Sequence, residues 1–133
     1  MPEMRLLVDG MNVIGSRPDG WWRNRKDAMR RLVEALSAYV EATGDEVTVV
    51  LDSKPFDIGT ETSVVAVRFA PGGRNAGDDE IVRLLESDES PETVTVATSD
   101  RELGRRVEAL GASVSPAGAL RGELDRLDRD GIG

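Results

Sequence analysis

The chain begins its first apolar run with Leu6-Leu7-Val8 and ends that run with Asp9-Gly10-Met11-Asn12. The segment Met4–Val8 predicts a short strand, and Asp9-Gly10 predicts a turn at its carboxyl end. An aspartate at the end of a buried strand is poorly placed for stability. We therefore interpret Asp9 as a functional residue, with a turn or cap residue as the alternative.

Acids follow later apolar runs in the same way. Asp52 directly follows the continuous run Val47–Leu51, and Asp100 comes shortly after another strand-like segment. A pair of acids, Asp78 and Asp79, opens a helix-like segment. Each acid also has a structural interpretation. Asp52 could start a loop or support the site from behind, the pair could favour a helix dipole, and Asp100 could cap a helix.

Strand-like and helix-like segments alternate along the whole chain. We expect strands over Met4–Val8, Val47–Leu51, Ser63–Ala70, Thr93–Ala97 and Ala112–Ser115, and helices over Lys26–Thr43, Asp78–Glu86, Asp100–Leu110 and Leu120–Leu127. This alternation implies right-handed crossovers and a mostly parallel central sheet with helices on both faces. We therefore predict one three-layer, Rossmann-like α/β domain over residues 1–133.

The expected topology brings the acidic positions together. In a parallel sheet, ligands bind beyond the carboxyl ends of the strands, where Asp9, Asp52 and Asp100 would all lie. The pair Asp78-Asp79 follows a strand at the same edge. Carboxylates gathered in this way repel one another unless a cation lies among them. Since Mg²⁺ and Mn²⁺ prefer oxygen ligands, the sequence predicts a divalent metal site that serves phosphate chemistry.

The composition excludes several other kinds of chemistry. The sequence contains no histidine and no cysteine, which excludes a histidine general base, a cysteine nucleophile, disulfides and thiolate zinc sites. No apolar run approaches the roughly 20 residues of a transmembrane helix, and the N-terminus lacks the features of a signal peptide. We expect a soluble cytoplasmic protein without membrane contact.

The charge is unevenly distributed. A net charge of −8 argues at first against nucleic-acid binding, yet residues 1–31 carry seven basic and only four acidic side chains. This basic part includes Trp21-Trp22-Arg23-Asn24-Arg25-Lys26, of which we expect one tryptophan in the core and one exposed. Aromatic rings stack on bases while Arg and Lys contact phosphates. The candidate nucleic-acid-binding residues are Trp21, Trp22, Arg23, Arg25, Lys26, Arg74 and Ser99.

The acidic motifs follow one another as Leu7-Val8-Asp9-Gly10-Met11-Asn12-Val13-Ile14-Gly15, Leu51-Asp52-Ser53, Ala76-Gly77-Asp78-Asp79-Glu80-Ile81 and Ala97-Thr98-Ser99-Asp100. In this order they resemble the NYN domain of the PIN-like nuclease superfamily, and most closely its YacP-like branch. The resemblance covers nearly the whole chain. It implies a PIN-like fold and a metal-dependent ribonuclease, typically an endonuclease.

The resemblance also implies which residues act. Mg²⁺ or Mn²⁺ would be held by Asp9, Asp78, Asp79 and Asp100, with Asn12 in a supporting place. Some YacP-like proteins are linked to messenger RNA cleavage on the ribosome, so the ribosome is a candidate partner beside RNA. Two positions depart from the family pattern. Met11 stands where tyrosine is frequent, and Gly77-Asp78-Asp79 stands where Ala-Asp-Glu is frequent.

We predict a Mg²⁺- or Mn²⁺-dependent endoribonuclease that hydrolyses single-stranded RNA. Its catalytic residues would be Asp9, Asn12, Asp78, Asp79 and Asp100, and Asp52 would be a further metal ligand. One alternative is an RNA- or ribosome-binding protein without activity, which would not need all four acidic motifs. Another is a Mg²⁺-dependent phosphatase of small substrates, which would need an acid at the position of Met11. The cleavage specificity, the choice between RNA and DNA, the number of metals and the oligomeric state stay open.

Overall fold

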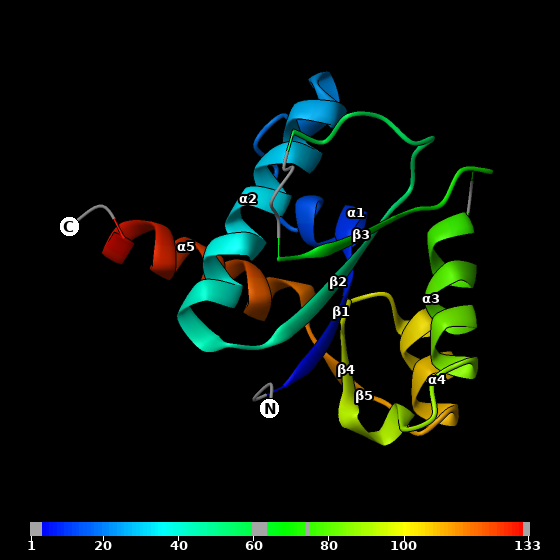
Figure 1. The fold of residues 1–133 in the computed structure, drawn as a ribbon. Coiled ribbons are helices and arrows are strands. Elements are labelled where there is room, and N and C mark those ends of the chain that lie inside the picture. Colours follow the sequence, from blue (N-terminus) through cyan, green and yellow to red (C-terminus); the bar gives the residue numbers. More distant parts are fainter. Residues whose placement is uncertain (1–3, 60–63, 74, 132–133) are drawn as a thin grey trace.

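The computed structural model describes residues 4–59, 64–73 and 75–131 and shows a three-layer α/β fold (Figure 1). The described strands are β1 (Arg5–Asp9), β2 (Glu46–Leu51), β3 (Ala66–Phe69), β4 (Val94–Ala97) and β5 (Ser113–Ser115). They form one sheet in the order β3-β2-β1-β4-β5, and every described strand pair is parallel. The predicted α/β class with a parallel central sheet is confirmed.

Helices cover both faces of this sheet. They are α1 (Gly10–Ile14), α2 (Arg25–Thr43), α3 (Ala76–Glu86), α4 (Arg101–Ala109) and α5 (Ala117–Gly131), with 3-10 turns η1 (Trp21–Arg23) and η2 (Pro91–Thr93). Figure 1 shows α2 and α5 on one side of the strands and α3 and α4 on the other. Within the described ranges, no helix combines the length and the apolar character that a membrane crossing requires.

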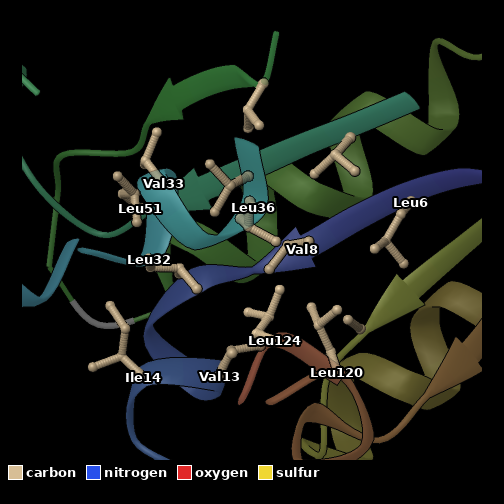
Figure 2. Packing of buried hydrophobic residues seen from close by; sticks show 14 of the residues in the cluster. Leu6, Val8, Val13, Ile14, Leu32, Val33, Leu36, Leu51, Leu120 and Leu124 are labelled. Carbon is tan, nitrogen blue, oxygen red and sulfur yellow. The ribbon is translucent and has the colours of Figure 1, made fainter. Parts of the chain in front are cut away.

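Alternating side chains of the strands build two cores. Leu6 and Val8 of β1 face α2 and α5, whereas Leu7 points into the layer formed by α3 and α4. Figure 2 shows the first core, in which Leu32 and Leu124 from two different helices lie close to β1. Burial on both faces explains why these strands are continuous apolar runs. It also holds the strand ends, and the acids that follow them, in fixed positions.

Local signals account for α2, which is predicted to within one residue. The side chain of Asn24 caps its first turn by accepting a hydrogen bond of 3.1 Å from the backbone N–H of Asp27. Its buried apolar residues recur with the helical period, and the helix ends at Gly44, whose φ of 77° favours glycine.

The predicted turn at Asp9-Gly10 is wrong, because α1 begins there without an intervening loop. Glycine makes this possible. A Cβ atom on Gly10 would lie 2.7 Å from the backbone oxygen of Val50 in the neighbouring strand. The missing side chain lets the helix start directly against β2, which keeps Asp9 at the sheet edge.

The bounds of β3 and α5 also differ from the prediction. The expected strand Ser63–Ala70 is reduced to β3, and Ser63 lies outside the described residues. Helix α5 is longer than the expected Leu120–Leu127 and begins immediately after Pro116. Gly118 and Gly122, in the first half of the helix, weaken the local helix signal. Burial of Leu120 and Leu124 against the first core overrides that weakness.

Candidate active site at the carboxyl edge of the sheet

The chain changes direction across the sheet at β1, since β2 and β3 lie on one side of it and β4 and β5 on the other. Such a switch point leaves a crevice beyond the strand ends, where ligands bind in open α/β sheets. Asp9 is the last residue of β1, Asp52 directly follows β2, and Thr98 directly follows β4. We call this edge the acidic rim, formed by Asp9, Asp52, Asp78 and Asp100.

Asp9 is the most buried acid of the rim, with 7% of its surface exposed. Its Oδ2 accepts a hydrogen bond of 2.8 Å from the hydroxyl of Thr98, and that hydroxyl oxygen accepts one of 3.1 Å from the N–H of Asp100. Burial raises the pKa of Asp9 to about 6, against the opposing effect of the Thr98 hydrogen bond. The charges of Asp78, Asp52 and Asp100 raise the same pKa further, so all four carboxylates interact.

Asp52 lies against the first turn of α3. A Cβ atom on Gly77 would fall 1.8 Å from Oδ1 of Asp52, so only glycine leaves space for this carboxylate. Burial raises the pKa of Asp52, while the charge of Arg25 and a hydrogen bond from the backbone N–H of Gly77 lower it. A helix N-terminus is a favourable place for a negative charge. Asp52 therefore belongs to the rim and does not merely start a loop.

The two acids of α3 point in different directions, as adjacent helical residues must. Asp78 is half-buried, and burial followed by the charges of Asp100 and Asp52 raises its pKa, while Arg106 opposes the shift. Asp79 has a side chain that is 68% exposed, and its Oδ1 accepts a hydrogen bond of 3.2 Å from Arg106. The structure thus brings Asp78 into the rim and turns Asp79 toward α4.

Asp100 has both a structural and an electrostatic role. Its Oδ1 accepts a hydrogen bond of 3.0 Å from the N–H of Leu103, which caps α4 as the structural alternative predicted. The same carboxylate raises the pKa of Asp9 and of Asp78. Capping fixes one oxygen of Asp100 while its charge acts on the rim.

Asn12 and Ser99 connect elements around the rim. The side-chain oxygen of Asn12 accepts a hydrogen bond of 2.8 Å from the N–H of Ser99. The hydroxyl oxygen of Ser99 accepts one of 2.9 Å from the N–H of Ala117, at the start of α5. Among the described residues, Asn12 therefore bonds to the loop after β4 rather than to Asp9. Both side chains position backbone segments beside the acids.

The donor set of the rim fits a hydrated divalent ion. In residues 4–59, 64–73 and 75–131, no three acidic side chains are arranged to bind one ion directly. Mg²⁺, however, keeps several waters and needs only one or two carboxylates in direct contact. A cation among the four acids would also relieve the repulsion that raises the pKa values of Asp9 and Asp78.

The aromatic and basic segment lies next to the rim. Trp22 is 54% exposed, whereas Trp21 is half-buried and packs against the first core, as expected for one tryptophan of the pair. The guanidinium carbon of Arg23 lies 5.9 Å from the ring centre of Trp22, and that of Arg25 lies 5.5 Å from Trp21. Since the charge of Arg25 also acts on Asp52, this segment borders the acids.

Lys26 and Arg74 are two further candidate binding residues. The Nζ of Lys26 lies 5.4 Å from the ring centre of Phe56, a residue of the loop after β2 that the sequence did not single out. Phe56 is half-buried against the first core, and Lys26 connects it with the aromatic and basic segment. Arg74 lies outside the described residues.

Sequence reasoning assigned no role to three residues of this site. Thr98 was visible in its motif, but its hydroxyl could not be paired with Asp9 before the strands were placed. Gly77 was noted only as part of a departure from the family pattern, without a structural role. Arg106 could not be connected with the acids from the sequence, since its partner Asp79 is 27 positions away.

Comparisons with known proteins agree with this geometry. The family model of the YacP-like NYN domain matches residues 6–131. A crystal structure of the W164L mutant of Rae1 (YacP) from Bacillus subtilis is 28% identical, with a TM-score of 0.76, over 96% of this chain and 78% of that one. A second Rae1 (YacP) structure from Bacillus subtilis gives 27% identity and a TM-score of 0.75, over 94% and 75% of the two chains. No match to a curated protein was found.

Proposed function

Because the chain belongs to the family of YacP-like NYN domains, a PIN-like nuclease family, we propose that it is a metal-dependent endoribonuclease. Its substrate in this proposal is single-stranded RNA, and the reaction is hydrolysis of a phosphodiester bond. The observation that carries the proposal is the electrostatic coupling of Asp9 with Asp52, Asp78 and Asp100 at the switch point of the sheet. These acids come from four separate parts of the chain.

We assign the roles of metal ligands to Asp9, Asp78 and Asp100, with Asp52 and Asp79 as supporting acids. A bound Mg²⁺ or Mn²⁺ would supply an activated water and stabilise the charge on the phosphate oxygens. Thr98 orients Asp9 through its hydroxyl, and the cap on α4 orients Asp100. Asn12 and Ser99 hold the loop after β4 in place.

Binding of the RNA strand is assigned to the aromatic and basic segment. Exposed Trp22 offers a ring on which a base can stack, and neighbouring Arg23 and Arg25 offer charges to phosphates. Lys26, which lies beside Phe56 of the loop after β2, continues this surface. Action on messenger RNA at the ribosome stays a prediction that follows from the family resemblance alone.

The test is a cleavage assay on single-stranded RNA across a series of divalent metals, with Asp9→Asn and Asp100→Asn beside the parent protein. We expect cleavage with Mg²⁺ or Mn²⁺, no cleavage with a chelator, and a loss of at least a hundredfold in both variants. Cleavage that persists in the chelator, or full activity in Asp9→Asn, would contradict the assignment. A DNA strand of the same sequence measures the preference for RNA.

A further inference from the structure

A concave site lies outside the acidic rim, between the end of α1, the turn η1 and the facing sides of α2 and α5. Its volume is about 190 Å³, and Trp21 forms part of its wall. The charged groups that line it are Arg23, Arg31, Arg121 and Asp19. We call it the arginine cleft. Three cations against one acid give it a positive lining in a chain whose net charge is −8.

One hydrogen-bond donor of Arg121, a residue of the cleft lining, lacks an acceptor among the described residues. The Nε of Arg121 is buried and makes no hydrogen bond to any described residue, although 23% of the side chain is exposed. The nearest acid is Asp125, whose Oδ1 lies 3.8 Å from this nitrogen, too far for a hydrogen bond. Asp125 also forms an ion pair with Arg17 and is therefore shared between two guanidinium groups.

This arrangement costs stability. A buried donor without an acceptor loses its hydration and gains nothing in return. Burial and the neighbouring charges of Arg17 and Arg31 lower the pKa of Arg121, against the attraction of Asp19. An anion in the cleft that contacts the exposed part of the Arg121 side chain would offset the repulsion from Arg17 and Arg31. The cleft is also smaller than the roughly 300–1,000 Å³ that encloses a drug-sized ligand, so it suits a single small anionic group.

The cleft is continuous with the surface that we assign to RNA binding. Trp21 lines the cleft, and the guanidinium carbon of Arg25 lies 5.5 Å from the centre of its ring. The charge of Arg25 in turn acts on Asp52 of the acidic rim. A strand that crosses the rim and contacts this segment would reach the cleft next. Its backbone carries one phosphate per nucleotide, which Arg binds well.

We propose that the arginine cleft binds one phosphate group of the RNA strand through Arg121 and Arg31. This inference rests on the proposed ribonuclease function, because it adds a contact to the same substrate at a distance from the bond that is cut. Such a contact would set the position of the strand relative to the acids without taking part in the reaction.

The test measures RNA binding in the Asp9→Asn background with a chelator, so that binding is separated from cleavage. Fluorescence anisotropy with a short single-stranded RNA compares Arg121→Met and Arg31→Gln with Arg126→Met. Arg126 lies on the same helix, is 58% exposed and is paired with Glu123, which makes it a matched control. We expect about a tenfold loss of affinity for Arg121→Met and no loss for the control.

Two further measurements separate a binding role from a structural one. Loss of one phosphate contact should lower the slope of log affinity against log salt concentration by about 0.7. Arg121→Met should also unfold at the same temperature as the parent or a higher one, since an unsatisfied donor is removed. If this variant fails to fold, Arg31→Gln carries the test, because the Arg31 side chain is 71% exposed.

The outcomes distinguish this inference from the proposed function. Unchanged affinity and salt slope in both cleft variants, in a protein that binds and cleaves RNA, would overturn the cleft site alone. A parent protein that neither binds nor cleaves RNA would overturn the proposed function and this inference with it. Oligonucleotides with and without a terminal phosphate show which phosphate is bound. If Arg121→Met loses the same affinity for both oligonucleotides, the bound phosphate is an internal one.

Discussion

Asp9 accepts one hydrogen bond, is almost completely buried and interacts with three other carboxylates. Each of these features except the hydrogen bond makes its charged form less stable. A residue selected for stability alone would be neutral at this position. The cost is understandable if a cation binds there, because the cation reverses the sign of the local electrostatic effect.

The first prediction concerns Asp9 and pH, in the metal-free protein. Because its pKa is raised from 3.8 to about 6, the folded state binds more protons than the unfolded state between these values. The free energy of unfolding should therefore fall as the pH rises through this window, by up to about 3 kcal/mol. Asp9→Asn removes the effect and should be more stable than the parent at neutral pH.

Denaturant unfolding at a series of pH values, with a chelator present, measures this difference. Asp79→Asn is the control, since that carboxylate is 68% exposed and lies in the same acidic motif as Asp78. The free energies of unfolding of the parent and of Asp9→Asn should converge near pH 4. If the parent is more stable than Asp9→Asn at neutral pH, burial does not destabilise the charged form of Asp9.

At the scale of elements, the first turn of α3 is fitted to the end of β2. The helix brings Asp78 into the rim, and its backbone at Gly77 lies directly against the carboxylate of Asp52. The capped start of α4 brings Asp100 in from the other side. Helix starts therefore place Asp78 and Asp100, while the ends of β1 and β2 place Asp9 and Asp52.

The second prediction is that Gly77→Ala lowers stability by about 1–3 kcal/mol, because the new methyl group would overlap the carboxylate of Asp52. Combining it with Asp52→Ala should recover most of that loss. Thermal unfolding of the parent, the two single variants and the double variant would measure this coupling. Gly122→Ala in α5 is the control. In the described part of the chain, its added methyl would have no neighbour within 4 Å outside the adjacent residues and the backbone of its own helix, so the variant should gain roughly 0.5–1 kcal/mol in stability. Equal effects of the two substitutions would disprove the close contact.

The third prediction concerns η1 and its tryptophans. Trp22→Ala should weaken binding of single-stranded RNA by about 1–3 kcal/mol with little change in stability, because the ring is exposed. Trp21→Ala should lower stability, because its ring packs against the first core. Parallel binding and unfolding measurements separate the two effects. If Trp22→Ala binds RNA as the parent does, η1 does not belong to the RNA-binding surface.

At the scale of the whole molecule, the order of the strands decides which residues meet. The acids become neighbours because β1 lies between β2 and β4 in a parallel sheet. The same edge of the molecule carries the basic and aromatic segment beside the acids. Positive groups for phosphates and negative groups for a metal are thus adjacent in a protein that is acidic as a whole.

The fourth prediction is that Mg²⁺ or Mn²⁺ stabilises the folded protein. Binding only to the folded state adds about 2.7 kcal/mol when the free ion is at a hundred times its Kd. The melting temperature should therefore rise with metal concentration in calorimetry. Asp78→Asn should reduce the increase, whereas Asp27→Asn, an acid of α2 that pairs with Arg31, should not. The same increase with Na⁺ at equal ionic strength would show screening rather than a site.

The sequence by itself determined the local structure and the chemical class of the site. Helix α2 and the first core follow from apolar periodicity and from stop signals that act within a few residues. The order of the acidic motifs sufficed to recognise the family. The convergence of the acids was predicted separately, because parallel strands place their carboxyl ends at one edge. These inferences needed no contact between distant residues.

Only the tertiary structure decided which partners each acid meets. Asp79 turns to Arg106 on another helix, Asp9 depends on the hydroxyl of Thr98, and Asp52 depends on the space left by Gly77. The burial of the Arg121 Nε, which has no acceptor among the described residues, likewise depends on the packed fold. Burial and pairing arise between segments that are far apart in the chain, and no local pattern contains them.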